Sequence, residues 1–558
     1  MIIILINTII TNTVIYSFGF IFFSFFFKEK SSKNNLSEIP LFGIIFLSFF
    51  TVGINFFFPI NKIIGTGILI FGIFNFIFIL KKNHVLIKKI FKNLLLASFI
   101  SYLLLSFSNI YRPDAGLYHL PFISMINESK IIIGSVNINF RYAITSIAQY
   151  LSATQNNYIF DLRSISIPIA SIFSYSILFM FHKFKKSLKS ENNLTSFLFF
   201  LITCYSLISF GRFSNYGNDS ISHLFFLILI IFIINNYRRL FFDIQKFNKI
   251  TLISIFLFST KPFMLMILVI PFIILIFNKN LKKIFQNKTS YIFGSLFLMW
   301  IIRTILISGC VIYPLEGFCI KNLKIYDHNQ TILEANSGEA WAKDWVNQKE
   351  KIEYVEYNKK FNWLDTWKKN HLKKIIEKIL PFLFFLAILT LILLYQNNKK
   401  INKVNHEIIF IFALSSILTL VWFLKFPLYR YGSSFIASFI ISAYILLLNF
   451  MNYLPDNKKF YKSYHIFIII CSLVFLSKNI IRINKNINEF NNKQWPDIYS
   501  VNNDYEINTF KPIYKDNEKI YFFSNGSLCM YSSSPCSNYK INNLNKKEVF
   551  TYKIYWKN

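Results

Sequence analysis

Long apolar runs recur along the whole of this 558-residue chain, and they constrain its fold more than any other feature. A run of about 18 or more apolar residues can cross the hydrocarbon core of a bilayer as a helix. Charged residues make up only 16% of the chain, too few to cover a soluble body of this size. A disordered chain is excluded as well, because the apolar content is far too high. The sequence therefore predicts a polytopic membrane protein.

The predicted fold is all-α, with about 12 transmembrane helices. We expect spans near residues 2–27, 40–60, 63–80, 93–110, 163–181, 194–210, 221–235, 290–308, 379–396, 407–425, 433–451 and 464–478. The apolar stretch 250–277 is different, because Ser259-Thr260-Lys261-Pro262 interrupts it and proline breaks a helix. We expect a broken re-entrant hairpin there, whereas a single crossing would invert every span that follows.

The basic residues predict the orientation. The chain has 60 Lys and Arg against 27 Asp and Glu, and in a multi-pass protein such an excess fixes topology and does not indicate nucleic-acid binding. The clusters fall in one set of loops, near residues 28–33, 81–92, 183–189, 238–249, 279–288, 399–403 and 458–462. We expect that set to face the cytoplasm. Both termini and the segments 111–160, 211–220, 309–378 and 426–432 would then lie outside, and the apolar N-terminus, which has no cleavage site, would be a retained span.

These spans and loops divide the chain into five parts. We expect a four-span bundle at 1–110, a membrane core at 111–308, an outer loop at 309–378, a second four-span bundle at 379–478 and an outer tail at 479–558. Trp341, Trp345, Trp363 and Trp367, at i,i+4 spacing in the outer loop, predict interfacial helices with aromatics at headgroup level. The tail alternates polar and apolar residues, which predicts a small α/β or β module.

Six cysteines test this topology independently. Cys310 and Cys319 share the outer loop, and Cys529 and Cys536 share the tail. Two close pairs on the predicted outer side indicate disulfides formed in an oxidising compartment, with chance placement as the alternative.

Ionisable residues next to hydrocarbon are candidates for function, and the richest such segment runs from Tyr111 to Pro121. Asp114, Tyr118 and His119 follow a predicted span directly, at the outer face. The carboxylate of Asp114 could take a proton from an incoming hydroxyl or hold a divalent cation. The alternative is that Asp114 only caps the surface helix expected at 115–128.

A second carboxylate, Asp219, ends the short outer loop 211–220, with His223 one helical turn later. Two Asp/His pairs on one membrane face make Asp114, Asp219 and His223 candidate ligands of a metal, and a divalent cation is the cofactor to consider. The alternative is that both aspartates are helix N-caps and both imidazoles are interfacial.

Four cations suit an anionic lipid-linked substrate: Arg141, Lys261, Arg303 and Arg430. Arginine binds phosphate through paired N–H donors, and Lys261 and Arg303 lie at membrane depth in the predicted topology. The alternatives are snorkelling to headgroups for Arg141 and a packed Arg–Asp pair for Arg303.

Taken together, these motifs resemble a known family. Four groups of short motifs lie in order across roughly residues 105–435. They are Asp114 to His119 with Asn137 and Phe140-Arg141; Asn218-Asp219; Ser308-Gly309-Cys310 with Tyr313-Pro314 and Cys319; and Pro427 with Arg430-Tyr431-Gly432. This arrangement is similar to GT-C fold glycosyltransferases, and most similar to a group of long bacterial inner-membrane proteins with GT-C-like features. The resemblance implies that Asp114 is the base or a metal-associated acid, that Asp219 assists, and that the break at Lys261 belongs to the site. From their own chemistry and position we also expect His119 to take part in catalysis, and substrate to be bound by Tyr118, Arg141, Lys261, Arg303, Arg430 and Tyr431.

The function that follows is transfer of a sugar from a polyprenyl-phosphate donor to a glycan or lipid-linked acceptor, on the outer face of the bacterial inner membrane. Such a reaction belongs to polysaccharide biosynthesis in the cell envelope. Three alternatives stay open: an O-antigen or capsule polymerase or ligase, a flippase or transporter of lipid-linked sugars, and a scaffold without activity.

Overall fold

The computed structural model describes residues 2–27, 36–82, 84–108, 113–160, 162–189, 192–210, 213, 216, 219–278, 281–348, 350, 352–359, 361–395, 406–489, 494–495, 511–515 and 518–557. Within these ranges, ten helical segments are long and apolar enough to cross a membrane: Ile2–Phe27, Ile39–Phe57, Lys62–Lys82, Leu162–Ser187, Ser220–Arg239, Lys288–Ser308, Leu364–Tyr395, His406–Lys425, Tyr429–Phe450 and Tyr461–Asn488. The chain is therefore a multi-pass membrane protein that is mostly helical, as its apolar runs predict.

Two of the expected spans do not belong to that set. The helix α4 (Ile87–Leu105) replaces the span expected at 93–110, and its first two turns contain three lysines. The helix α8 (Asn193–Ser209) has only 17 residues. A count of about 12 crossings therefore stays a prediction. The basic clusters at 28–33 and 399–403 lie outside the described residues.

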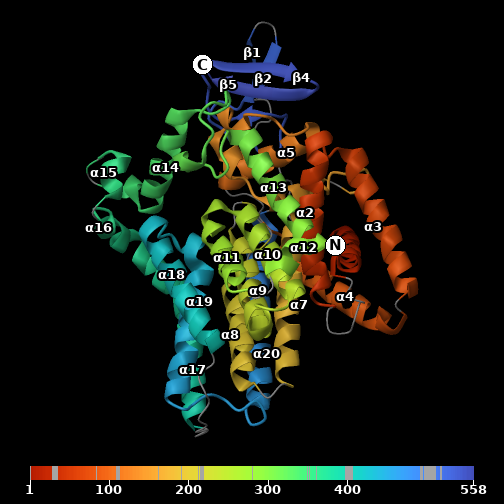
Figure 1. The fold of residues 1–558 in the computed structure, drawn as a ribbon, viewed down its shortest axis with the longest axis vertical. Coiled ribbons are helices and arrows are strands. Elements are labelled where there is room, and N and C mark those ends of the chain that lie inside the picture. Colours follow the sequence, from red (N-terminus) through yellow and green to blue (C-terminus); the bar gives the residue numbers. More distant parts are fainter. Residues whose placement is uncertain are drawn as a thin grey trace.

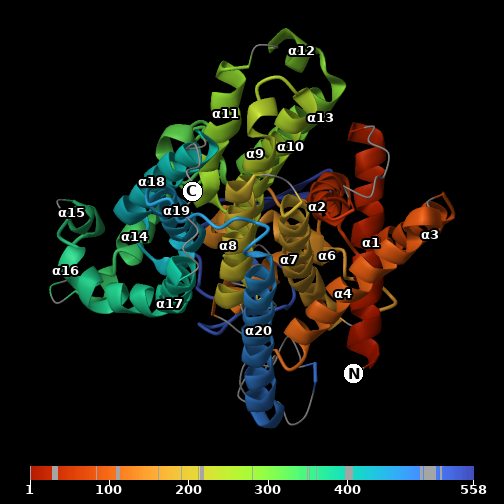
Figure 2. The ribbon, with the colours of Figure 1, turned by 90° about the horizontal axis from the view of Figure 1, so that it is seen from below.

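The long helices form three groups (Figures 1 and 2). The central group contains α7 (Ile167–Ser187), α8, α9 (Ser220–Asn236), α10 (Ile244–Thr260) and α20 (Tyr461–Glu489). On one side lie α1 (Ile2–Phe22), α2 (Ile39–Phe57), α3 (Lys62–Lys82) and α4. On the other lie α17 (Lys373–Tyr395), α18 (His406–Lys425) and α19 (Tyr429–Phe450). Segments distant in sequence thus line the central group from both sides.

Two glycines bring α1 and α2 into close contact. A Cβ atom at Gly19 would overlap the backbone oxygen of Ile39, and one at Gly43 would overlap the backbone oxygen of Ile15. Small residues at a crossing let helix backbones approach closely in a membrane, where packing rather than water drives association.

The expected break in 250–277 is present. The helix α10 ends at Thr260, Lys261 is extended (φ −157°, ψ 136°), and a 3₁₀ turn from Pro262 leads into α11 (Val269–Ile276). The helix α11 packs back against α10 instead of continuing it. The short helix α12 (Leu281–Gln286) then leads into α13 (Lys288–Ser308), which also contacts α10.

Three segments that the sequence predicts to lie outside the membrane come together at one end of the molecule, drawn at the top of Figure 1. The first contains α5 (Leu120–Glu128) and α6 (Ile147–Ala153). The second contains α14 (His328–Ala342), which reaches this end, and α15 (Tyr354–Asn358) and α16 (Leu364–Trp367), which lie to the side near α18. The third is the tail, with strands β1 (Lys511–Lys515), β2 (Glu518–Phe523), β3 (Cys536–Ser537), β4 (Leu544–Val549) and β5 (Tyr552–Lys557).

The tail forms two small sheets. Strand β2 pairs antiparallel with β1 and parallel with β3, while β4 and β5 form an antiparallel pair. Strand β5 also contacts the first outer segment, because Ile133 donates to the oxygen of Lys553 and accepts from the nitrogen of Tyr555. The predicted strand-rich module is confirmed, and it is docked on the rest of the chain.

Both predicted disulfides are present, Cys310–Cys319 and Cys529–Cys536. The second closes a loop whose Met530 donates a backbone hydrogen bond to the oxygen of Gly116, at 2.9 Å. The tail is therefore anchored directly beside Asp114.

Three observations bear on these expectations. The last span continues to Glu489, so the region 479–489 is helix and not tail. Trp363 and Trp367, predicted to lie at headgroup level, are 1% and 5% exposed, and their rings pack against Phe423. Finally, two of the basic residues used to assign topology are buried ion-pair partners: Lys183 and Lys249 both contact Glu38, at 2.6 and 3.2 Å.

Candidate functional site

The break between α10 and α11 places a cation against the start of α9. The Nζ atom of Lys261 lies 2.9 Å from Oδ1 of Asp219, and the two side chains are 13% and 4% exposed. Asp219 stands at the N-cap position of α9, yet its side chain makes no capping hydrogen bond. The capping alternative for Asp219 is therefore wrong in this structure, since the carboxylate faces Lys261 instead.

Asp114 has a similar arrangement with a different cation. Its Oδ2 atom lies 3.2 Å from Nη1 of Arg430, which is in the first turn of α19. Asp114 precedes the π-helical turn Ala115–His119 and makes no capping hydrogen bond. This pair is half-exposed, at 31% and 41% for the two side chains, so it lies nearer the surface than the pair of Asp219 and Lys261.

Two tyrosines join the two ion pairs into one cluster. The charges of Asp114, Asp219 and Lys261 all act on the hydroxyl group of the buried Tyr118. Tyr431 accepts a hydrogen bond from Arg430 at 2.9 Å. Burial is the main cause that raises the pKa of Tyr118 to about 12, so this phenol stays protonated. The structure therefore brings together Asp114, Tyr118, Asp219, Lys261, Arg430 and Tyr431, here called the paired-aspartate site.

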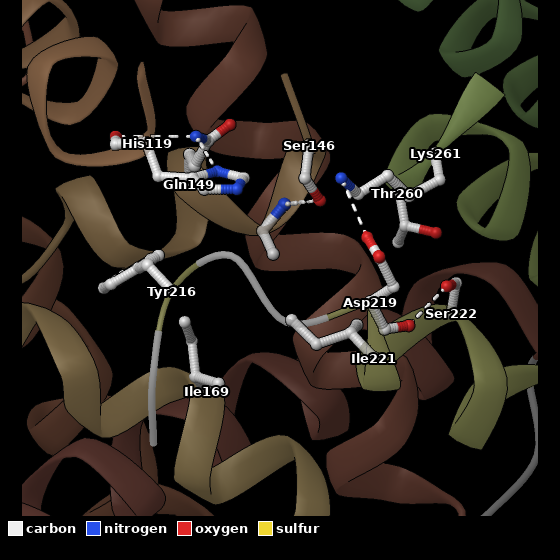
Figure 3. Close-up of a pocket in the computed structure, with 11 residues that line it drawn as sticks. His119, Ser146, Gln149, Ile169, Tyr216, Asp219, Ile221, Ser222, Thr260 and Lys261 are labelled. Atoms are coloured by element: carbon white, nitrogen blue, oxygen red, sulfur yellow. Dashed lines mark hydrogen bonds and ion pairs between the residues drawn. The ribbon is translucent and has the colours of Figure 1, made fainter. Parts of the chain in front are cut away.

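A pocket of about 370 Å³ opens beside this site (Figure 3). Its polar lining comes from four regions of the chain: His119, Ser146 and Gln149, Tyr216 with Asp219 and Ser222, and Thr260 with Lys261. Asp219 and Lys261 form one of its walls.

His119 lines this pocket without touching Asp114. Its Nδ1 atom lies 2.7 Å from the amide nitrogen of Gln149, and the residue is 5% exposed. Burial, and then the charges of Lys261 and Arg430, hold the pKa of His119 well below its ordinary value. A neutral imidazole follows, so His119 is not suited to act as the acid in catalysis.

His223 is not available to a metal ion. Its two ring nitrogens lie 2.8 Å from Oγ of Ser434 and 2.7 Å from the backbone oxygen of Arg430. Within the described parts of the chain, no group of three or more His, Cys, Asp or Glu residues could hold a metal ion. Of the candidate metal ligands, His223 has both ring nitrogens in contact with protein groups, and Asp114 and Asp219 are each paired with a cation.

Arg303 is apart from the paired-aspartate site. It is 0% exposed, and its guanidinium bonds to the hydroxyls of Tyr150 and Thr145. Its carbon Cζ lies 4.6, 5.2 and 5.6 Å from the ring centres of Trp300, Phe122 and Tyr150. Cation–π contacts of this kind stabilise a buried guanidinium, although Nη1 of Arg303 has no hydrogen-bond partner among the described residues.

Arg141 belongs to another cluster, formed by the outer loop and the tail. Its guanidinium lies over the ring of Phe140, at 4.3 Å, and its charge acts on Glu334 and Tyr539. Arg141, which the sequence predicts to bind substrate, thus acts on Glu334 of α14 and on Tyr539 of the tail.

Sequence reasoning missed Gln149, Ser146 and Tyr216. Each contributes to the pocket lining, but glutamine, serine and tyrosine have no spacing rule that marks them as site residues. Asn218, a member of the family-like motifs, lies outside the described residues, as do Tyr111 and Arg112.

Comparison with known proteins identifies a family. The family model described as a domain of unknown function (DUF8201) matches residues 1–437 of the 558. The matched range contains the whole paired-aspartate site. No curated protein and no solved structure matches the chain.

Proposed function

This chain belongs to the DUF8201 family, and from its paired-aspartate site we propose that it is a membrane glycosyltransferase of the GT-C type. It would move a sugar from a polyprenyl-phosphate donor to an acceptor hydroxyl on the extracytoplasmic face of the bacterial inner membrane. Asp114 acts as the base, Asp219 orients the substrate, and Lys261 and Arg430 hold the donor phosphate.

One observation carries the proposal: two carboxylates and two cations from four separate segments converge beside one pocket. Asp114 precedes α5, Asp219 begins α9, Lys261 lies at the helix break and Arg430 begins α19. The buried charges of Asp219 and Lys261 are costly, and a purely structural role would not need the second pair, Asp114 and Arg430, beside them. A reaction that removes a proton and releases a phosphate needs both an acceptor for the proton and cations for the leaving group.

The proposed step is a displacement at the anomeric carbon. The acceptor oxygen forms a bond to that carbon while the bond to the phosphate oxygen breaks. The acceptor proton moves to Asp114, and the electron pair of the broken bond leaves with the polyprenyl phosphate. Arg430 and Lys261 then stabilise the negative charge on the phosphate. The effect of Lys261 is stronger than it would be in bulk water, because its side chain is only 13% exposed. A divalent cation is not required by this scheme.

The test is an Asp114→Asn variant assayed in membrane vesicles, with a panel of radiolabelled polyprenyl-phosphate sugars as donors. We expect normal insertion and a 10²–10⁴-fold loss of transfer, the usual contribution of a general base. The matched control is Asp365→Asn, since Asp365 is an exposed acid in α16 and its loss should leave transfer unchanged. Full activity of Asp114→Asn would remove this residue from the mechanism.

A second candidate is a transporter of lipid-linked sugars. The specific observation in its favour is the discontinuous helix α10–α11, whose break places Lys261 in the pocket wall, as broken helices form the binding sites of many transporters. Accumulation of labelled lipid-linked sugar across sealed vesicles, without formation of a new glycosidic bond, would favour this function over transfer.

A further inference from the structure

The pocket contains two buried polar atoms that no described residue pairs with. These are Nε2 of His119 and Oε1 of Gln149, on residues that are 5% and 1% exposed. Both residues line the pocket. Buried polar groups in folded proteins are nearly always hydrogen-bonded. Two unpaired atoms in the lining of one pocket therefore indicate a bound group, an ordered water or a ligand hydroxyl, that supplies the missing partners.

The contacts between the two residues identify which atom donates. The amide nitrogen of Gln149 lies 2.7 Å from Nδ1 and 3.4 Å from the backbone oxygen of His119. An amide oxygen in that position would face the carbonyl oxygen, so the nitrogen belongs there. The amide therefore donates to Nδ1, which carries no hydrogen. The hydrogen of the neutral imidazole is then on Nε2.

The pocket thus presents one N–H donor, from His119, and one carbonyl acceptor, from Gln149. In Figure 3 the imidazole lies between the Gln149 amide and the middle of the pocket. A hydroxyl group can both accept from an N–H and donate to a carbonyl oxygen. A phosphate dianion can only accept, and it would leave the oxygen of Gln149 facing a negative charge.

The charged groups are on a different wall. Asp219 and Lys261 face each other there, while His119 and Gln149 carry no charge. We propose that His119 and Gln149 recognise a hydroxyl-bearing, uncharged sugar ring, with Gln149 as the residue that selects it. This inference rests on the proposed function and assigns the two ends of the donor: the sugar lies against His119 and Gln149, and the phosphate lies at Lys261 and Arg430.

The experiment measures binding without turnover. Purified protein in detergent is titrated with glucose, galactose, mannose, N-acetylglucosamine and, separately, inorganic phosphate, and the thermal unfolding midpoint is followed. The variant is Gln149→Met, which keeps the length of the side chain and removes both polar atoms. Its matched control is Gln348→Met, a partly exposed glutamine of the outer loop.

We expect at least one neutral sugar to stabilise the native protein and the Gln348→Met variant equally. In Gln149→Met the apparent affinity for that sugar should fall at least tenfold, while the response to inorganic phosphate should change less than twofold. An unchanged phosphate response also shows that the variant pocket is folded. Equal sugar binding by Gln149→Met, or no neutral sugar binding by the native protein, would overturn the assignment.

The Asp114→Asn variant separates this inference from the proposed function. It should bind the sugar as the native protein does and fail to transfer it. If Asp114→Asn transfers sugar normally, the proposed mechanism fails while sugar binding by Gln149 stands. If Gln149→Met binds and transfers every sugar as the native protein does, the recognition pair fails while the glycosyltransferase stands.

Discussion

Lys261 forms a nearly buried ion pair with Asp219, with Nζ 2.9 Å from Oδ1 and side chains only 13% and 4% exposed. The two residues are brought together by different means: Asp219 begins α9, and Lys261 interrupts the stretch between α10 and α11. The break in the helix is thus what allows a lysine to reach the acid. If the helix continued through Lys261, the lysine would have helical backbone angles and its side chain would lie along the helix surface.

The first prediction concerns this pair. Lys261→Met should destabilise the protein by about 3–5 kcal/mol, because it leaves a buried carboxylate without a partner. The double variant Lys261→Met/Asp219→Asn should lose less of the free energy of unfolding than Lys261→Met alone, because it leaves no unpaired carboxylate. Chemical unfolding in mild detergent measures both. Lys425→Met is the control, since Lys425 pairs with Glu339 at the surface and is 57% exposed, and its loss should cost at most about 1 kcal/mol. Equal losses from Lys261→Met and Lys425→Met would contradict the prediction.

The second prediction concerns Glu334, in the outer cluster that contains Arg141. Burial raises the pKa of Glu334 from 4.5 to about 7, against the opposing effects of Arg141 and the hydrogen bond from Gln330. The folded state therefore binds a proton that the unfolded state releases, and stability should fall as the pH rises from 4.5 to about 7. After solvent screening the change is about 1–2 kcal/mol.

Glu334→Gln should remove that pH dependence and be the more stable protein at pH 8. Unfolding midpoints measured from pH 4 to pH 8 test this, with Glu356→Gln as the control because Glu356 is 59% exposed in its ion pair with Lys359. The prediction is contradicted if the native protein becomes more stable between pH 5 and pH 7 and Glu334→Gln is less stable than the native protein at pH 8. Glu334 would then be ionised in the folded state.

The third prediction concerns the crossing of α1 and α2. Gly43→Ala should cost about 1–3 kcal/mol, because the added methyl group overlaps the backbone of Ile15, which cannot move as a side chain can. Gly67→Ala is the matched control, since a Cβ atom there meets nothing within 4 Å, and alanine is the better helix former by at most about 1 kcal/mol. If both variants unfold at the same temperature, the close approach of the two helices is not present in the membrane.

The fourth prediction concerns the tail. Removal of the Cys529–Cys536 disulfide, in a Cys529→Ser/Cys536→Ser variant, should destabilise the tail by about 2–3 kcal/mol, the value for a loop of this length. The tail should then be cut faster by protease, and sugar transfer should fall, because Met530 of that loop bonds to Gly116 beside Asp114. A reducing agent should affect the native protein in the same direction and leave the tail of the variant unchanged. Unaltered transfer after loss of the disulfide would show that the tail does not position the site.

The sequence by itself determined the class of the fold and most of its elements. The ten helices of membrane length in the described part of the chain, the break at Lys261, the strands of the tail and both disulfides follow from apolar run length, proline position, alternation and cysteine spacing. These are local properties, so neighbouring residues contain the information. The same holds for the positions of Asp114 and Asp219, which directly flank helices.

Only the tertiary structure decided which groups meet. Asp114 and Arg430 are 316 residues apart, and nothing near either residue indicates the other. Arg303, which the sequence offers as a phosphate ligand, lies among aromatic rings, while Gln149, which has no motif, bonds to His119 in the pocket. Such partnerships depend on how whole helices cross and on where the tail docks. Those arrangements follow from the packing of many side chains together, and no short stretch of sequence specifies them.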